Sequence, residues 1–262
     1  MAQTSRIVGE LAFSDISKLL RDTSILCLPL GAIEQHGPHL PLDTDVVVAE
    51  GLTRRIVARW GDEFDLWQLP ALPIGLSREH DWAPGTLSLS IACFVALLRD
   101  LARSLTRALP ARNLVIVNGH GGNRGVLENL HYELRGDFGL NSCAIHPFDL
   151  ARIESTPGAP DIHGGKSETS VMLALAPDRV RMKRLAAADS SHRPEAVEAL
   201  IFDRGATWPW RSDNRGLGQD GVIGDPRGAS AELGRDIIER VVSECGHVFH
   251  RLLESDSTRT AS

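Results

Sequence analysis

Acidic and imidazole side chains gather in two short segments, and each segment follows an apolar run typical of a buried strand. The first, after residues 24–30, carries Glu34, His36 and Asp45, and the second, after residues 114–117, carries His120 between glycines. Because parallel strands end at the same edge of a sheet, we expect these side chains to lie close together. Carboxylates and imidazoles bind zinc, manganese or iron, so the sequence predicts the metal site of a hydrolase.

A third segment, residues 163–170, adds another imidazole and another carboxylate just before a predicted helix. These are His163 and Glu168, and a glutamate at this place is either a metal ligand or a cap of the helix. Asp43 and Asp45 precede a different helix, and one of the two is expected to be its N-cap. His39 is a further imidazole, without a second signal that connects it to the site.

The glycines on both sides of His120, in residues 118–123, let the backbone approach a ligand closely. A glycine turn between a strand and a helix also binds phosphate, so a non-catalytic phosphate-ligand-binding protein is the alternative from another class. The imidazole favours a metal, and the chain has no Gly-x-Ser-x-Gly nucleophile motif. The four cysteines form no Cys-x-x-Cys pair and are predicted to be buried free thiols: Cys27, Cys93, Cys143 and Cys245.

The apolar pattern predicts strands that alternate with helices. Strands are expected at residues 24–30, 66–72, 114–117 and 142–148, and helices at 45–60, 90–109, 124–135, 169–176 and 231–253. Pro70 and Pro73 should shorten the second strand or place it at an edge, and residues 208–230 should form an ordered loop or small hairpin. The alternation predicts an α/β fold: a single three-layer α/β/α domain with a mainly parallel central sheet, residues 1–262, with its core at about 20–253.

Composition limits the partners of this chain. Its 262 residues carry a net charge of −6 and are 42% apolar, which is ordinary for a folded globular chain and unlike a nucleic-acid-binding surface. No stretch has the roughly 20 apolar residues that a membrane span needs, and the N-terminus does not resemble a secretory signal. We therefore expect no nucleic-acid and no membrane partner, and a cytoplasmic location.

Several motifs together resemble one known family. The run Leu-Pro-Leu-Gly-Ala-Ile-Glu-Gln-His-Gly-Pro-His-Leu-Pro-Leu-Asp-Thr-Asp, residues 28–45, is similar to the opening signature of the creatininase family of metal-dependent amidohydrolases. Further matches follow in the family's order: Glu79-His80 with Pro84-Gly85-Thr86, then residues 118–123, 163–170 and 221–232. The resemblance extends over most of the chain, from about residue 20 to residue 245.

This resemblance implies two divalent metal ions per chain, which could be Zn, Mn or Fe. Carried over by position, Glu34 and His120 would bind one ion. His36 would bind the other ion, and Asp45 would bridge the two. Asp43 would then be the structural aspartate at the start of the helix.

The remaining roles also follow from the resemblance. Creatininase itself uses a glutamate at the position of Gly122, whereas other members with glycine there use the position of Glu168. A metal-activated water would attack an amide carbonyl, and His163 would protonate the leaving nitrogen. Residues expected to orient the ligands from outside are Glu79, His80, Asn118 and Asn123.

The substrate is less determined than the chemistry. Creatininase encloses its small ring with aromatic side chains, one of them at the position of Ala159, so creatinine itself is not the expected substrate. The first expectation is another small amide, either cyclic or open. The alternative is a peptidase that removes a C-terminal dipeptide from a modified precursor peptide of the mycofactocin type. The family also implies a homo-oligomer, in the form of a hexamer.

Overall fold

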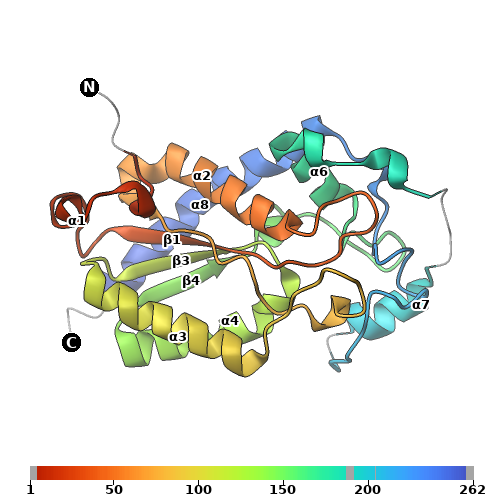
Figure 1. The fold of residues 1–262 in the computed structure, drawn as a ribbon, viewed down its shortest axis with the longest axis horizontal. Helices are drawn as coiled ribbons and strands as arrows, with labels where there is room; N and C mark the ends of the chain where they lie inside the picture. Colours follow the sequence, from red (N-terminus) through yellow and green to blue (C-terminus); the bar gives the residue numbers. More distant parts are fainter. Residues whose placement is uncertain (1–4, 187–191, 204, 258–262) are drawn as a thin grey trace.

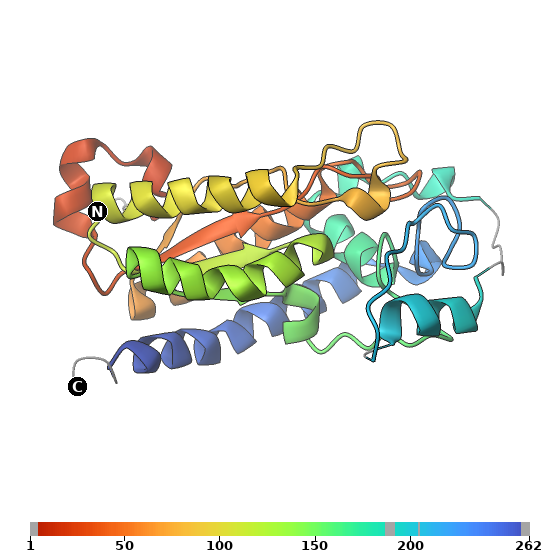
Figure 2. The ribbon, with the colours of Figure 1, turned by 90° about the horizontal axis from the view of Figure 1, so that it is seen from below.

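Four strands form one sheet in which every pair of neighbours is parallel. The computed structural model describes residues 5–186, 192–203 and 205–257. The strand order is β2-β1-β3-β4, with bounds Ile25–Leu30 for β1, Leu66–Gln68 for β2, Asn113–Asn118 for β3 and Asn141–Ile145 for β4. Helices cover both faces of the sheet (Figures 1 and 2), so the predicted α/β fold with a parallel sheet between helices is confirmed.

Two groups of helices form the outer layers. The longer helices are α2 (Thr44–Phe64), α3 (Ile91–Ala108), α4 (Arg124–Phe138), α6 (Lys166–Leu175) and α8 (Ala231–Ser257). Shorter ones are α1 (Phe13–Leu19), α5 (Pro147–Leu150) and α7 (Pro194–Val197). In Figure 1, α2 and α8 lie on one side of the sheet and α3 and α4 on the other.

The apolar core is divided by the sheet, as the alternation of side chains along a strand requires. Ile25 and Cys27 of β1 pack with α2, α6 and α8, whereas Leu26 and Leu28 pack with α3 and α4. All of these side chains are buried, so β1 is covered on both faces. This is why its sequence is an unbroken apolar run without polar residues on alternate positions.

The register of the two central strands places their ends side by side. Leu30, the last residue of β1, is the partner of Asn118, the last residue of β3. The loops that follow both strands therefore begin at the same edge of the sheet. Gly119 continues from β3 so close to the start of α2 that a Cβ on it would lie 2.3 Å from the carbonyl oxygen of Asp45.

Some element boundaries differ from the sequence prediction. β2 ends at Gln68, before Pro70, and occupies the edge of the sheet as expected. β4 ends at Ile145 because Pro147 starts the short helix α5, where the missing proline N–H costs nothing. α6 begins at Lys166, three residues earlier than predicted, and this places Glu168 in its first turn.

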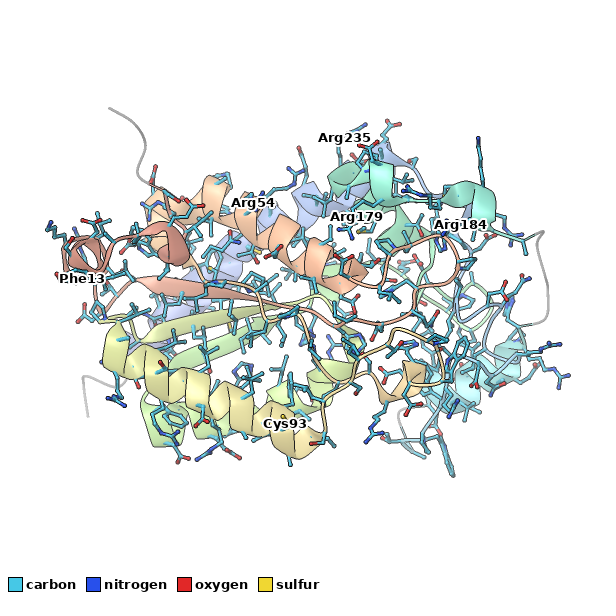
Figure 3. The ribbon with its side chains drawn as sticks, in the orientation of Figure 1. Phe13, Arg54, Cys93, Arg179, Arg184 and Arg235 are labelled. Atoms are coloured by element: carbon cyan, nitrogen blue, oxygen red, sulfur yellow. The ribbon has the colours of Figure 1, made fainter. Side chains whose placement is uncertain are left out.

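The prediction of four buried thiols was wrong for two of them. Cys27 and Cys245 are buried, but Cys143 is half-buried and Cys93 is exposed. Cys93 lies at the start of α3 (Figure 3), on the side of that helix that the apolar stripe leaves outside. In the described part of the chain, no helix has the length and apolar character to cross a membrane.

Candidate metal centre

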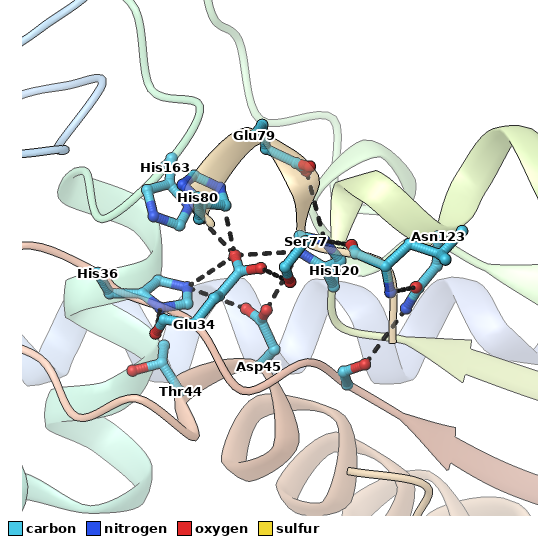
Figure 4. A network of polar contacts seen from close by, with 12 residues as sticks. Glu34, His36, Thr44, Asp45, Ser77, Glu79, His80, His120, Asn123 and His163 are labelled. Carbon is cyan, nitrogen blue, oxygen red and sulfur yellow. Dashed lines mark hydrogen bonds and ion pairs between the residues drawn. The ribbon is translucent and has the colours of Figure 1, made fainter. Parts of the chain in front are cut away.

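Four of the predicted ligands and the predicted proton donor His163 meet at the edge where β1 and β3 end, and they come from four separate segments (Figure 4). Glu34 and His36 lie on the loop after β1, and Asp45 lies in the first turn of α2. His120 follows β3 directly, on the glycine turn. His163 lies on the loop before α6. All five side chains are buried.

Glu34 is at the centre of this cluster. Its Oε1 lies 3.1 Å from His120 Nδ1, 3.5 Å from His80 Nε2 and 3.6 Å from His163 Nδ1. The other carboxylate oxygen, Oε2, accepts a short hydrogen bond from the hydroxyl of Ser77. One oxygen of Glu34 is thus held from outside, and the other faces imidazole nitrogens.

Asp45 lies between two imidazoles, one on each carboxylate oxygen. Its Oδ1 is 3.0 Å from His36 Nε2, and its Oδ2 is 3.2 Å from His120 Nδ1. A carboxylate in this position can reach cations on both sides. The arrangement matches the bridging position that the sequence resemblance implies for this residue.

Three of the imidazoles point one nitrogen into the cluster and the other outward. In each ring the outer nitrogen donates to a backbone carbonyl, which fixes a proton there, so in the neutral ring it is the inner nitrogen that carries the lone pair. These bonds are His36 Nδ1 to the oxygen of Glu34 (3.2 Å), His120 Nε2 to the oxygen of Leu76 (2.5 Å), and His163 Nε2 to the oxygen of Gln35 (2.6 Å). An inner nitrogen with a lone pair is what a metal ion or a transferable proton requires.

Two buried carboxylate oxygens of the cluster indicate, independently of the family resemblance, that it fits divalent cations. Glu34 Oε1 and Asp45 Oδ2 are buried oxygens that accept no hydrogen bond within the described residues. A buried carboxylate oxygen without a donor is costly unless a cation neutralises it. Three groups of residues have ligand atoms within 4.8 Å of one another: Glu34, Asp45 and His120; His36, His163 and Glu168; and Glu34, His80 and His163. Mixed imidazole and carboxylate sets of this kind suit zinc, manganese and iron.

Glu168 reaches this centre while it also stabilises the start of α6. Its Oε1 lies 3.9 Å from His36 Nε2, and its Oε2 accepts a hydrogen bond of 2.5 Å from the N–H of Gly164. The two predicted roles, ligand and helix-terminal acceptor, are therefore compatible, because each uses a different oxygen.

Without a cation, the charges of the cluster shift the pKa values of its members strongly. Burial would lower the pKa of His36, but the charge of Asp45, the hydrogen bond to it and the charges of Glu168 and Glu34 raise it to about 10. Burial also opposes ionisation of Asp45, yet His36 and His120 hold its pKa well below the usual range. The metal-free centre is therefore a network of ionised pairs.

Glu168 and His163 shift toward their neutral forms, whereas the charges of Glu34 and Asp45 raise the pKa of His120 well above its usual value against the effect of burial. Burial is the main cause that raises the pKa of Glu168 to about 7. The charge of Asp45 adds to this rise, and the charge of His36 opposes it. Burial lowers the pKa of His163 well below its usual value, and the charge of His36 lowers it further. The His163 ring lies between those of His36 and His80, at centroid distances of 4.3 and 3.9 Å, so these rings are not all positively charged at once.

The residues predicted to lie outside the ligands divide into two kinds. Glu79 and His80 approach the centre: Glu79 Oε1 is 3.5 Å from the outer nitrogen of His120, and His80 points Nε2 at Glu34. Asn118 and Asn123 instead hold the glycine turn. Asn118 Nδ2 donates to the oxygen of His120 at 2.7 Å, and Asn123 Nδ2 donates to Asn118 Oδ1 at 3.1 Å.

Two residues whose role the sequence left open, His39 and Asp43, lie apart from the centre. His39 Nε2 is 2.8 Å from the hydroxyl oxygen of Thr169, and His39 belongs to none of the three ligand groups. Asp43 occupies the N-cap position of α2, but its side chain accepts no capping hydrogen bond. It pairs with Arg179 at 2.5 Å instead, so the expectation of a side-chain cap was wrong.

Sequence reasoning missed three polar residues that touch the cluster. Ser77 donates to Glu34, whereas Gln35 and Ser212 contact the outer nitrogen of His80 at 3.0 and 2.7 Å. Gln35 lies between two predicted ligands, and this position was the available signal. Ser212 lies 132 residues from His80 along the chain, and no local pattern indicates the contact.

Two cavities adjoin the centre from different sides. One of about 510 Å³ is lined by Trp208, Trp210, Arg78 and Arg211, among others. One of about 290 Å³ has a largely apolar wall that includes Phe148, Ile153, Ile201 and Phe202. Both cavities are also lined by His120, Gly121, Ile162 and Glu168. A substrate bound at the centre therefore has room on both sides.

The surroundings of Gly122 leave no room for a side chain at this position of the glycine turn. A Cβ on Gly122 would lie 2.5 Å from His120 Nε2 and 2.6 Å from Glu79 Oε1. It would also lie 2.6 Å from the backbone oxygen of Leu76. The space is already filled, so this position accommodates no side chain in the present arrangement.

Comparison with known proteins gives the family. A family model described as creatininase, creatinine amidohydrolase, matches residues 9–249. The chain belongs to the creatininase family. It is therefore an amidohydrolase, a hydrolase acting on carbon–nitrogen bonds, and the alternative of a non-catalytic phosphate-binding protein was wrong.

Relatives within the family act on different substrates. The chain is 37% identical over 249 residues to the mycofactocin precursor peptide peptidase of Mycobacterium tuberculosis (strain CDC 1551 / Oshkosh), covering 91% of this chain and 90% of the relative. It is 33% identical over 202 residues to the creatinine amidohydrolase of Pseudomonas putida, covering 69% and 76%.

Solved creatininases share this fold. A creatininase described as the Mn form superimposes with a TM-score of 0.73 at 27% identity, and a mutant described as the Zn–Zn type superimposes with 0.74 at 27%. Each comparison covers 95% of this chain and 98% of the other.

Proposed function

We propose that this creatininase-family member is a divalent-metal-dependent enzyme that hydrolyses an amide bond near the end of a peptide. The observation that carries the metal dependence is the pair of buried carboxylate oxygens without hydrogen-bond donors, Glu34 Oε1 and Asp45 Oδ2, which both face the inner nitrogen of His120. Solved relatives described as Mn and Zn–Zn forms support the same reading.

The ligand atoms suggest how two ions would be held. Glu34, Asp45 and His120 would hold one ion. His36 and Glu168 would hold the other, with Asp45 shared between the two. This agrees with the set that the family signature implies, and it uses Glu168 in place of a side chain at position 122.

Two bound divalent cations would acidify water and polarise the amide carbonyl. The chain itself would supply proton transfer through His163, whose Nε2–H is fixed by the carbonyl of Gln35. Its inner Nδ1 can accept the proton released when water oxygen bonds to the carbonyl carbon. The same Nδ1 then gives the proton to the nitrogen as the C–N bond breaks, and the products are a carboxylic acid and an amine. Glu168, with a pKa raised to about 7 mainly by burial, is the second group that can hold this proton.

The two cavities favour a peptide over a small ring. A ring needs one enclosed pocket, whereas an extended chain needs space on both sides of the bond that is cut. The larger cavity has Arg78 and Arg211 in its wall, and both guanidinium groups lie 3.6–3.7 Å from the carboxylate of Asp81. Arg78 has no closer ionic partner within the described residues, so we place the free carboxylate of the peptide beside Arg78.

A small cyclic amide is the second candidate, because the solved relatives are creatininases. Ala159 weakens it, since this chain lacks a large aromatic side chain at that position to close over a ring. The relative at 37% identity, named as a precursor peptide peptidase, supports the first candidate.

The proposal is tested on protein reconstituted with Zn²⁺ or Mn²⁺. We expect about two ions per chain and release of a C-terminal fragment from short synthetic peptides, detected by mass spectrometry, with creatinine cut far more slowly. Asp45→Asn should lose metal and activity, whereas His131→Gln, a half-buried histidine away from the centre, should keep both. A wild-type protein that binds no stoichiometric metal, or whose activity survives a strong chelator, would contradict the proposal.

The proposed contact between Arg78 and the free C-terminal carboxylate of the peptide is tested separately. Arg78→Gln should raise KM about tenfold for peptides with a free C-terminus, which corresponds to the loss of one charge-assisted hydrogen bond. KM for the same peptides with an amidated C-terminus should not change. Equal effects on both peptide series would place the carboxylate elsewhere.

A further inference from the structure

His80 differs from the other three imidazoles of the cluster. The outer nitrogens of His36, His120 and His163 each have a carbonyl oxygen, which can only accept, in hydrogen-bond reach, and for His163 this oxygen at 2.6 Å is closer than the Gln35 amide nitrogen at 3.1 Å. The outer nitrogen of His80, Nδ1, faces the hydroxyl of Ser212 at 2.7 Å and the amide nitrogen of Gln35 at 3.0 Å. Both of these neighbours can donate, so the proton of His80 needs a different position.

The orientation of the Gln35 amide follows from its partners. Gln35 Oε1 accepts from the N–H of Gly37 at 2.8 Å, and Nε2 lies 3.0 Å from the carbonyl oxygen of Gly221, which can only accept. The group near His80 is therefore the NH₂ end, a donor. One of its hydrogens is directed to Gly221, and the other is available to the His80 side.

The hydroxyl of Ser212 is also surrounded by donors. Trp82 Nε1, which can only donate, lies 2.9 Å from Ser212 Oγ, and Gln35 Nε2 lies 3.1 Å from it. The hydroxyl proton then has two acceptors in reach, His80 Nδ1 at 2.7 Å and the oxygen of Glu79 at 3.3 Å. The Glu79 oxygen already accepts from the backbone N–H of Ser212 at 3.0 Å. The short contact to His80 is the better use of the hydroxyl proton.

We infer that Ser212 is a positioning residue that keeps His80 unprotonated at Nδ1, so that His80 turns its Nε2–H toward Glu34 and is not a metal ligand. This inference rests on the proposed function, because it assigns a role beside the proposed ligands. Glu34, His80 and His163 have ligand atoms within 4.8 Å of one another and could on distance alone hold an ion. A proton on His80 Nε2 removes the lone pair that this third arrangement would need.

The role of this N–H is to hold a carboxylate. Ser77 donates a hydrogen bond to Glu34 Oε2, and His80 Nε2–H points at Oε1 from 3.5 Å, a favourable N–H to carboxylate contact that is too long for a hydrogen bond. One hydrogen bond and one longer polar contact thus orient the proposed ligand from outside, as outer partners of metal-bound carboxylates do in general. Arg211 lines the larger cavity, and Ser212 is the next residue along the chain. Through its contact with His80, Ser212 therefore connects this cavity wall to the proposed metal ligand Glu34.

The test compares variants in the metal-loaded enzyme. Ser212→Ala removes the shorter of the two donor contacts to His80 Nδ1 and leaves only the Gln35 amide at 3.0 Å, so the Nε2–H form that points at Glu34 is held less firmly. We expect kcat to fall about tenfold with KM within a factor of two and with two ions still bound, as for other outer partners of metal ligands. Ser212→Thr keeps the hydroxyl and should restore most of the rate. Ser142→Ala, which removes a serine–histidine contact of 2.8 Å with His131 away from the centre, should leave kcat unchanged.

A second variant separates donor from ligand. His80→Gln keeps an N–H at a similar reach, so both ions and most of the activity should remain, whereas His80→Leu should keep the ions and lose the rate. Loss of one ion in His80→Gln, or a kcat of Ser212→Ala equal to that of the wild type, would overturn the inference. A wild type without metal and without amide hydrolysis would contradict the proposed function instead, so the two failures are distinguishable.

Discussion

Gly122→Ala tests whether the crowding around the glycine turn controls metal binding. A Cβ at this position would lie 2.5 Å from His120 Nε2, 2.6 Å from Glu79 Oε1 and 2.6 Å from the backbone oxygen of Leu76. Side chains can rotate away from such a contact, but a backbone carbonyl cannot move without its neighbours. Because the Leu76 oxygen also accepts the proton of His120 Nε2, relief of the clash breaks the bond that orients this imidazole.

The expected loss follows from that single hydrogen bond. Loss of an outer partner of a metal-binding histidine costs about 10–100-fold in metal affinity, or about 1.4–2.7 kcal/mol. Chelator competition measures it, with Zn²⁺ titrated into metal-free Gly122→Ala against a calibrated chelator. Gly122→Glu, which restores the residue type of creatininase, should also bind more weakly than the wild type, because its Cβ meets the same carbonyl.

The neighbouring glycine provides a matched control. Gly121 lies in the same short 3₁₀ turn, Gly121–Asn123, and a Cβ on it would meet no atom within 4 Å. Gly121→Ala therefore makes the same chemical change and restricts the unfolded chain in the same way, without the clash. If Gly122→Ala binds Zn²⁺ as tightly as Gly121→Ala, then the proposed link between this packing and the orientation of His120 is incorrect.

Three further predictions concern pH, stability and reactivity. In metal-free protein the pKa of His36 is raised to about 10, so below that pH metal binding must expel a proton from this ring. The apparent Zn²⁺ affinity should therefore rise about tenfold per pH unit between pH 7 and 9, and calorimetry in buffers of different ionisation enthalpy should detect the released proton. An affinity that does not change with pH would argue against this release. Ser90→Ala removes the side-chain oxygen that accepts the N–H of Cys93 at 3.2 Å at the start of α3, and denaturant unfolding should show a loss of about 1 kcal/mol. A maleimide should label Cys93 rapidly in the folded protein. Cys27 should react only on unfolding, because burial raises the pKa of its thiol far above the usual value. Peptide mapping of the labelled protein checks the order of reaction.

The layout of the fold was predictable because its signals are local. The unbroken apolar run that became β1 and the apolar stripe of α3 each depend on spacing within a few residues. Proline positions accounted for the short edge strand β2. Errors fell at element ends, for example at α6, where Lys166 to Glu168 joined the helix because Glu168 Oε2 accepts from the N–H of Gly164.

The proposed ligands were also accessible from the sequence, since they lie on strand ends and helix starts whose positions the local pattern gives. Their shared edge follows from parallel strands in register, with Leu30 beside Asn118. The roles of individual histidines could not be predicted from the sequence in this way. His39 and His80 look alike in the sequence, but one contacts Thr169 and the other faces Glu34.

By itself, the sequence determined that buried parallel strands would end in carboxylates and imidazoles, because apolar periodicity and residue type act over short distances along the chain. Only the tertiary structure decided which nitrogen each imidazole turns inward, since that depends on acceptors such as the oxygen of Leu76, 44 residues away from His120, and on donors such as Ser212, 132 residues away from His80. The cavities on both sides of the centre depend on tertiary structure for the same reason. Their walls combine loops that are distant in sequence, and packing alone brings those loops to one place.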